Sequence, residues 1–149
     1  MMKICFAGAG ALGSSLGGVL AAAGADVVLV DTWQAHVDSI NRHGLCLTTN
    51  AQEHRVAVRA ATGFESLGTM DLVIVLVKSF ATREVMQSAR AVVGEDTVVM
   101  SIQNGLGHEE ILAELVGRHR VIGAKTYAGG QLLSPGHVVA GIAGKETLM

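Results

Sequence analysis

Three glycines near the start of the chain have a spacing suited to holding phosphate. Gly8, Gly10 and Gly13 form a Gly-x-Gly-x-x-Gly pattern directly after an apolar run. The first glycine permits a tight turn, the second lets the backbone approach a pyrophosphate, and the third lets a helix pack close to a strand. The amides at the start of that helix favour negative charge. We therefore expect a dinucleotide site whose phosphates contact Gly8, Ala9, Gly10, Ala11, Leu12 and Gly13.

An acidic residue follows at the distance at which such sites bind a ribose. Asp31 lies 18 residues after Gly13, close to the usual spacing of about 20. A carboxylate accepts hydrogen bonds from a ribose 2′-hydroxyl group but repels a 2′-phosphate. No arginine occurs in residues 32–34. Local chemistry at Asp31 therefore favours NAD(H) over NADP(H). We expect Trp33 to pack against the second helix rather than against the adenine.

Two further polar residues end apolar runs. Lys78 ends the run 71–78, and Asn104 follows the run 97–102. The carboxyl ends of parallel strands meet at one edge of a sheet, where ligands bind, so we expect both side chains to reach the same crevice. The alternatives are a solvated lysine and a plain Asn-Gly turn. Ser79 or Thr82 is expected to cap the next helix, and His108 to lie in solvent at a helix start.

The elements that must position these residues alternate between strand and helix. Strand-like runs cover 3–8, 26–31, 71–78, 97–102 and 120–125, and helical patterns cover 11–23, 33–43, 81–93 and 106–117. This alternation predicts an α/β fold with a Rossmann-like, doubly wound parallel sheet in one dinucleotide-binding domain, residues 1–149. The composition, 50% hydrophobic and 3% aromatic, suits buried parallel strands under closely packed helices.

The first apolar stretch allows other interpretations. Residues 4–25 carry no charge and follow Lys3, as in a membrane span or a secretory signal. Its many glycines disfavour a continuous helix, and its removal would take the first strand from the alternation, so we prefer the nucleotide site. A methyltransferase that binds S-adenosylmethionine is a further alternative, because such folds also pair a glycine loop with an acid.

Charge and cysteine content limit the partners. The net charge is −2, without a basic or acidic cluster, so neither nucleic acid nor a membrane surface is an expected partner. Cys5 and Cys46 lie in apolar segments without the sequence spacing of metal ligands. We expect no metal site, a core position for Cys5, and a reducing, cytoplasmic location.

The ordered motifs resemble one enzyme family. They are "GAGALGSSLGG", "VDTWQAHVDSINRHGL", "VKSFAT", "SIQNGLGHEE" and "GAKTYAGGQLLSPGHVVAGIAG". Together they are similar to the ketopantoate reductases (2-dehydropantoate 2-reductases). The resemblance implies a NAD(P)H-dependent oxidoreductase of pantothenate biosynthesis that reduces the keto group of a small 2-keto acid. It also implies that Lys78 and Asn104 act as catalytic residues, that Gly129 lies against the cofactor, and that the last strands form an antiparallel hairpin.

The sequence departs from the family in two respects. Family members generally use NADPH and often have a basic residue where this chain has Asp31, so NADP(H) is the family expectation while NAD(H) stays open. The family also has a helical substrate domain that supplies the lysine protonating the carbonyl, and these residues do not include it. We expect the chain to be the cofactor-binding half of the enzyme, with little turnover alone.

Alternatives to this assignment follow from the same residues. The substrate could be another 2-keto acid or an acyl-CoA, or the chain could be a non-catalytic nucleotide-sensing domain. We also expect a homo-oligomer, because the face near Lys78, Asn104 and the hairpin would expose apolar side chains, and exposed apolar patches promote association.

Overall fold

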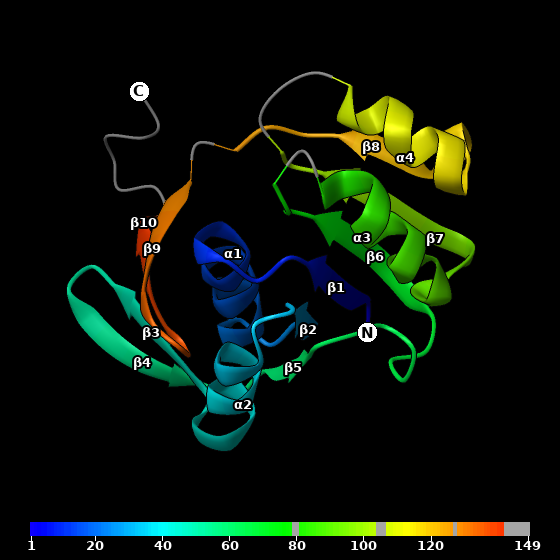
Figure 1. The fold of residues 1–149 in the computed structure, drawn as a ribbon. Coiled ribbons are helices and arrows are strands. Elements are labelled where there is room, and N and C mark those ends of the chain that lie inside the picture. The colour runs from blue at the N-terminus through cyan, green and yellow to red at the C-terminus, as the bar shows by residue number, and fades with distance from the viewer. Residues whose placement is uncertain (79–80, 104–106, 127, 142–149) are drawn as a thin grey trace.

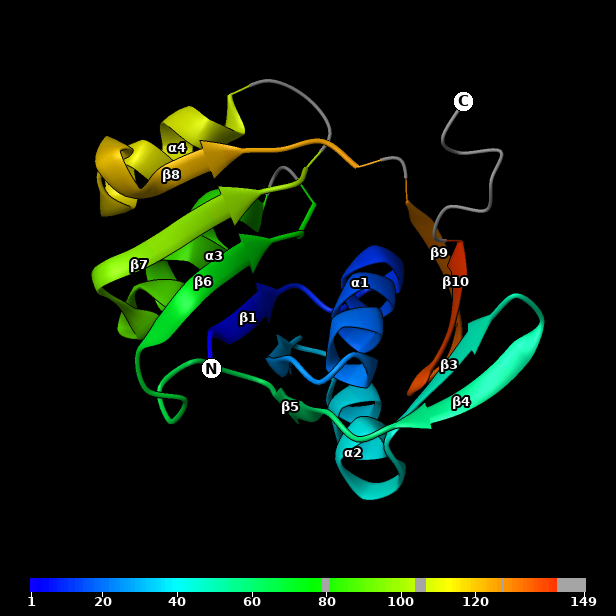
Figure 2. The same cartoon turned by 180° about the vertical axis from the view of Figure 1, so that it is seen from behind.

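The chain folds into two sheets with one helix between them. Figures 1 and 2 show the computed structural model, which describes residues 1–78, 81–103, 107–126 and 128–141. Helix α1 lies between the larger sheet and the smaller sheet in both views. Asn104 and the last eight residues, 142–149, lie outside the described residues.

The larger sheet is parallel throughout and has the strand order β5-β2-β1-β6-β7-β8. Counted in chain order within this sheet, that order is 3-2-1-4-5-6, which is the Rossmann arrangement. The predicted doubly wound parallel sheet is therefore confirmed. Its strands are β1 (Lys3–Ala7), β2 (Asp26–Val30), β5 (Arg59–Ala61), β6 (Met70–Val75), β7 (Val93–Ser101) and β8 (Val121–Gly123).

Helices cover both faces of this sheet because side chains alternate between the two faces along each strand. Ile4 and Phe6 of β1 pack in the core that contains α1 (Ala11–Ala22) and α2 (Gln34–His43). Cys5 and Ala7 pack in the opposite core. That second core lies under α3 (Thr82–Ala89) and α4 (His108–Val116), seen together on the other side of the sheet in Figure 1. Short 3-10 turns follow them at Arg90–Val92 and Arg118–Arg120.

Cys5 is a core residue, as predicted. Its side chain is fully buried, and burial raises the pKa of its thiol to about 12 although the nearby Arg59 charge acts in the opposite direction. Cys46 is also buried, in the smaller sheet.

The smaller sheet has the order β4-β3-β10-β9. Its strands are β3 (Leu45–Thr49), β4 (Gln52–Val56), β9 (Gly129–Ser134) and β10 (His137–Gly141). Strands β9 and β10 pair antiparallel, which confirms the predicted hairpin, and β10 pairs parallel with β3. The β3–β4 pair was not predicted, because the exposed residues of β4 give it no apolar pattern.

Helix α1 contacts both sheets, and this explains its small residues. A Cβ atom on Gly17 would meet Leu29 and Phe6 of the larger sheet, whereas one on Gly18 would meet Leu45 of the smaller sheet. The uncharged run 4–25 is thus a strand, a turn and a helix packed on two sides. Among the described residues, no helix combines the length and the apolarity that crossing a membrane requires.

Element ends differ from the predictions mainly around β7. The predicted helix 81–93 ends earlier, and β7 starts at Val93 rather than at residue 97. Residues 94–96, Gly-Glu-Asp, have a turn-like composition, but they extend β7 because Arg120, which is distant in sequence, bonds to this segment. Its guanidinium donates hydrogen bonds to the carbonyl groups of Gly94, Glu95 and Thr97 at 2.7–3.1 Å.

Candidate functional site

The three glycines of the first loop have different surroundings. Gly8 has a φ of +115° and donates its N–H to the Val30 carbonyl at 2.9 Å. A Cβ atom on Gly13 would overlap the Gly8 carbonyl oxygen, so α1 approaches the strand as closely as glycine permits. By contrast, no described atom lies within 4 Å of a Cβ placed on Gly10. The turn and the close helix contact agree with the expected roles, and the open side of Gly10 leaves room for a ligand.

The start of α1 is suited to an anion. Gly10 is its N-cap residue, and among the described residues no side chain caps it and no acid lies in its first turn. The first amides of a helix have no partner inside the helix, and the dipole makes this end favourable for negative charge. The predicted phosphate contacts of Ala11 and Leu12 are therefore geometrically feasible.

Asp31 lies at the carboxyl end of β2 and is held against the glycine loop. One carboxylate oxygen accepts a hydrogen bond from the Ala9 N–H at 3.0 Å, and the other accepts one from the Trp33 N–H at 2.9 Å. These bonds fix the carboxylate beside the loop while each oxygen keeps a lone pair for another donor.

A cavity of about 450 Å³ opens beside this carboxylate, at the ends of β2, β5 and β6. This is the side of the sheet at which ligands of doubly wound folds bind. Asp31, Glu65 and Glu84 line it together with Gly8, Phe64 and apolar parts of Val77 and Val85. None of the described residues that line it is a lysine or an arginine. The cavity is large enough for part of a nucleotide, and the charged side chains among its described lining residues are all acidic.

Lys78 follows β6 and is exposed. Its carbonyl accepts the Ala81 N–H at 2.8 Å, directly before α3. Residues on both sides of it, Val77 and Ala81, line the cavity, but Lys78 itself does not. Since Asn104 lies outside the described residues, the predicted pairing of the two side chains stays a prediction.

Gln103 connects the two loops that carry these residues. Its amide nitrogen donates to the Val77 carbonyl and to the Thr82 hydroxyl, both at 2.7 Å. Its amide oxygen accepts from the Ser101 hydroxyl at 3.0 Å. Sequence reasoning missed this role, although the position of Gln103 between a buried strand and an Asn-Gly turn was a signal.

At the neighbouring helix starts, the Thr82 alternative for the helix cap and the solvated position of His108 were wrong, while Ser79, the other cap candidate, lies outside the described residues. Thr82 does not cap α3, whose N-cap is Ala81 without a side-chain hydrogen bond. Its hydroxyl instead lies 3.4 Å from Nδ1 of His108. His108 is only 4% exposed, because α4 packs its first turn against α3, so the expected solvated histidine is buried.

Gly129 begins the hairpin and is exposed. No described atom lies within 4 Å of a Cβ atom placed on it. The close contact belongs to the next residue, since a Cβ atom on Gly130 would overlap Ser15 in the first turns of α1. The hairpin therefore starts against the helix that begins at the glycine loop, and the cofactor contact of Gly129 stays a prediction.

A buried histidine joins the other end of the hairpin to the same loop. The Gly136 N–H donates to Nδ1 of His36 at 2.8 Å, so that the ring proton lies on Nε2. Nε2 is 3.1 Å from the Ser14 hydroxyl, which in turn donates to the Ala9 carbonyl at 2.7 Å. Because Ala9 also binds Asp31, one chain of hydrogen bonds runs from the hairpin turn to the predicted ribose ligand.

His36 is neutral in this arrangement. Its burial lowers its pKa, against the smaller upward influences of the Ala9 carbonyl and the Asp31 charge. The Trp33 ring stacks on it, with ring centroids 5.5 Å apart. The predicted packing of Trp33 against the second helix is thus confirmed, although Trp33 itself is 44% exposed. The role of His36 was missed, since a histidine among helical residues carries no signal of a partner 100 positions away.

Comparisons with known proteins give the same assignment along almost the whole chain. Residues 4–148 match the family model described as ketopantoate reductase PanE/ApbA. A 2-dehydropantoate 2-reductase of Pyrococcus horikoshii is 41% identical over 139 residues, which cover 92% of this chain and 44% of that protein.

Solved structures extend the comparison to the fold. A D-mandelate dehydrogenase in complex with NADH and anilino(oxo)acetate has a TM-score of 0.88 and 33% identity, over 93% of this chain and 45% of that one. A 2-dehydropantoate 2-reductase from Enterococcus faecalis, described as putative, has a TM-score of 0.87 and 33% identity, with the same coverage. The chain thus spans less than half the length of these relatives.

Proposed function

The chain belongs to the ketopantoate reductase PanE/ApbA family, and we propose that it is the cofactor-binding part of a 2-dehydropantoate 2-reductase. The reaction is the transfer of a hydride from a reduced nicotinamide cofactor to the keto group of ketopantoate. The observation that carries the proposal is the glycine loop with Asp31 hydrogen-bonded to it, at the mouth of a cavity on the Rossmann crevice.

Residues of this chain fit a dinucleotide in three places. The open side of Gly10 and the first amides of α1 would hold the pyrophosphate. Asp31 would accept a hydrogen bond from the adenosine ribose, and the cavity of about 450 Å³ beside it would take the adenosine. When bound, the nicotinamide supplies the hydride. The chain's own part is to bind and orient the cofactor at the carboxyl ends of the strands.

We propose that the preferred cofactor is NAD(H), although NADP(H) is the family expectation. A 2′-phosphate would lie among Asp31, Glu65 and Glu84, which repel it, and no described lysine or arginine lines the cavity to compensate. The structurally similar D-mandelate dehydrogenase holds NADH. A carboxylate that binds a ribose hydroxyl is the usual choice of NAD-dependent folds.

Lys78 and Asn104 are proposed to act at the reacting end of the cofactor. Gln103 bonds to Val77, directly before Lys78, and directly precedes Asn104. This bond therefore ties the residue before Asn104 to the residue before Lys78. The Lys78 ammonium would attract the carboxylate of a 2-keto acid, and reduction of its carbonyl requires a proton donor for the developing alkoxide. Gly129 is proposed to contact the cofactor from the hairpin.

A second class of substrate is suggested by the structural similarity to a D-mandelate dehydrogenase. The substrate of the protein that carries this chain could be a 2-keto acid with an aromatic substituent instead of ketopantoate. Both hypotheses share the cofactor site, and the two substrates differ only in the substituent carried by the keto carbon.

The test compares the two keto acids in the protein that carries this chain. NADH oxidation is followed with ketopantoate and with phenylglyoxylate. A kcat/KM at least tenfold higher for ketopantoate supports the proposed enzyme, and the reverse order supports a mandelate-type dehydrogenase. Oxidation with neither substrate, in a protein that still binds NADH, would contradict both.

The cofactor choice is tested by Asp31→Asn. Loss of the charge is expected to raise the NADPH affinity relative to NADH by about tenfold, the effect of about 1.4 kcal/mol. Asp38→Asn is the matched control, because Asp38 lies on the following helix and bonds Gln34 rather than the loop. An unchanged NADH-to-NADPH ratio in Asp31→Asn would show that this carboxylate does not choose the cofactor.

A further inference from the structure

The smaller sheet has an outer face that turns away from α1. Leu45, Leu47 and Val138 point inward and belong to the core. Side chains alternate along a strand, so Cys46 and His137 point to the opposite side. These two residues are register partners in the parallel β3–β10 pair. Glu53 of β4 pairs with Thr48 and shares this outer face.

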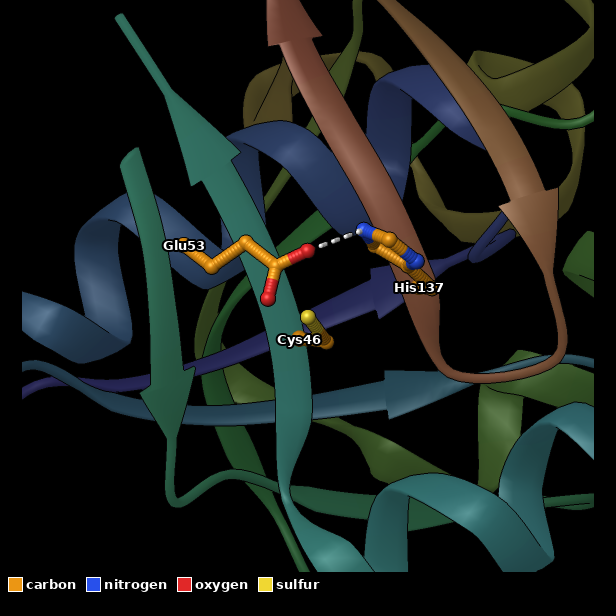
Figure 3. Close-up of side chains that lie close together, drawn as sticks. All are labelled: Cys46, Glu53 and His137. Atoms are coloured by element: carbon orange, nitrogen blue, oxygen red, sulfur yellow. Dashed lines mark ion pairs between the residues drawn. The ribbon is translucent and has the colours of Figure 1, made fainter. Parts of the chain in front are cut away.

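Three side chains from three strands converge there. One ligand atom from each of Cys46, Glu53 and His137 lies within 4.8 Å of the other two. Figure 3 shows the sulfur of Cys46 below the gap between the Glu53 carboxylate and the His137 ring. Nε2 of His137 is 3.8 Å from the Glu53 carboxylate and 3.3 Å from the Thr48 hydroxyl.

The cluster is closed on one side and open on the other. Cys46 is 7% exposed, while the side chains of His137 and Glu53 are 26% and 68% exposed. A bound ion would thus be coordinated by a buried sulfur on one side and would be open to solvent on the side of the Glu53 carboxylate.

We propose that Cys46, Glu53 and His137 bind a divalent transition-metal ion of the zinc type, with a water molecule as fourth ligand. Thiolate, imidazole and carboxylate are all zinc ligands, and zinc accepts them in tetrahedral geometry. A site with sulfur and nitrogen donors disfavours Mg²⁺ and Ca²⁺, which prefer oxygen ligands. On binding, the ion forms a bond to Sγ of Cys46 and the thiol proton passes to solvent.

The observed separations are close to those a metal requires. Bonds of about 2.0–2.3 Å in a tetrahedron place the ligand atoms about 3.5 Å apart. The Glu53 and His137 atoms are 3.8 Å apart and no pair exceeds 4.8 Å, so the ligand atoms must close by no more than about 1 Å, and the exposed Glu53 side chain is free to rotate. Strands β3 and β10 are already paired, with Cys46 and His137 as register partners, so the backbone brings these two ligands together before any ion binds.

The position of the site gives it a structural effect. The ion would tie β4 to β10, which otherwise have β3 between them in the sheet. His137 directly follows Gly136, whose N–H bonds His36. Metal binding would therefore stabilise the hairpin, which is linked to the glycine loop through His36 and Ser14, from the side of the smaller sheet opposite to α1.

The experiment is a titration of the 149-residue chain with Co²⁺ as a spectroscopic probe for zinc. One equivalent of Co²⁺ is expected to produce a thiolate-to-cobalt charge-transfer band, which Zn²⁺ then abolishes by displacement. Cys46→Ser should remove the band, and His137→Asn and Glu53→Gln should each weaken binding at least tenfold. Zn²⁺ should also raise the Tm of the unaltered chain but not that of Cys46→Ser.

Two variants serve as matched controls. Cys5→Ala removes the other cysteine, which lies in the opposite core, and His54→Asn removes an exposed histidine of β4. Both should keep the band and the Tm increase. Absence of a band in the unaltered chain, or a band that persists in Cys46→Ser, would overturn the proposal. So would a loss of binding in His54→Asn equal to that in His137→Asn, since it would indicate adventitious histidine binding.

Discussion

At the scale of single residues, the three glycines of the loop are not equivalent. A Cβ atom on Gly8 would collide with the backbone of Leu76, and one on Gly13 would collide with the Gly8 carbonyl. A Cβ atom on Gly10 would face open space. Contacts among the described residues therefore do not explain a glycine at position 10, and its open side suits the close approach of a ligand. We therefore propose that Gly8 and Gly13 are needed for folding and that Gly10 is needed for a ligand.

This difference predicts opposite results for two similar substitutions. Gly13→Ala should destabilise the chain by roughly 1–3 kcal/mol, because its Cβ atom overlaps the Gly8 carbonyl and forces a backbone shift. Gly10→Ala should leave the urea midpoint almost unchanged and weaken NADH binding at least tenfold. The measurements are urea unfolding and NADH titration of both variants. Equal cofactor affinities in Gly10→Ala and the unaltered chain would refute the proposed approach of the pyrophosphate.

At the scale of elements, the hairpin and the glycine loop are joined through α2. The path runs from Gly136 to His36, from His36 to Ser14 and from Ser14 to Ala9. It requires Nδ1 of His36 to accept a hydrogen bond, and a protonated ring cannot do so. Protonation of His36 should therefore weaken the contact between the two sheets.

Stability should depend on pH through this residue. The folded state lowers the pKa of His36, while the unfolded chain has the ordinary value of about 6.5. Between those values the unfolded state binds more protons, so the free energy of unfolding should fall as the pH drops below about 6.5. Urea unfolding between pH 7.5 and 5, which spans that value, measures this loss.

The matched variants are His36→Gln and His43→Gln. His36→Gln should reduce the loss of stability in that pH range, because it removes the titrating group. His43→Gln should retain the full loss, because His43 is exposed at the end of the same helix. A pH dependence that is identical in His36→Gln and the unaltered chain would mean that another group causes it.

The elements also show why some of the structure could be predicted and some could not. The glycine loop, the parallel strands and Asp31 depend on neighbours within about one strand-helix-strand unit, and their patterns are visible in the sequence. The smaller sheet depends on pairing of β3 with β10, as between Cys46 and His137. No local pattern reveals partners that far apart, so β4, the His36 contacts and the cluster of Cys46, Glu53 and His137 required the fold.

At the scale of the whole molecule, some apolar side chains have no cover among the described residues. Ile122 of β8 is 46% exposed and Leu133 of β9 is 50% exposed. Strand β8 forms an edge of the larger sheet, and exposed edges with apolar side chains promote pairing between chains. We therefore propose that the chain self-associates.

Light scattering checks this proposal. The chain should have an apparent mass of a dimer or more, and Ile122→Lys should shift it toward the monomer by adding a charge at the edge. Leu20→Lys is the control, because Leu20 is an exposed apolar residue on α1 rather than on a sheet edge. A monomer at high concentration would contradict the proposal.

Binding of a nicotinamide dinucleotide in the Asp31 crevice is the central claim, and titration of the chain with NADH and NADPH tests it most directly. Trp33 is the only tryptophan, and its backbone N–H donates to the Asp31 carboxylate, so energy transfer from its ring to the reduced nicotinamide reports binding near the crevice. We predict saturable binding of one NADH per chain, at least tenfold tighter than that of NADPH. Failure of both cofactors to bind a correctly folded chain would contradict the assignment of the site.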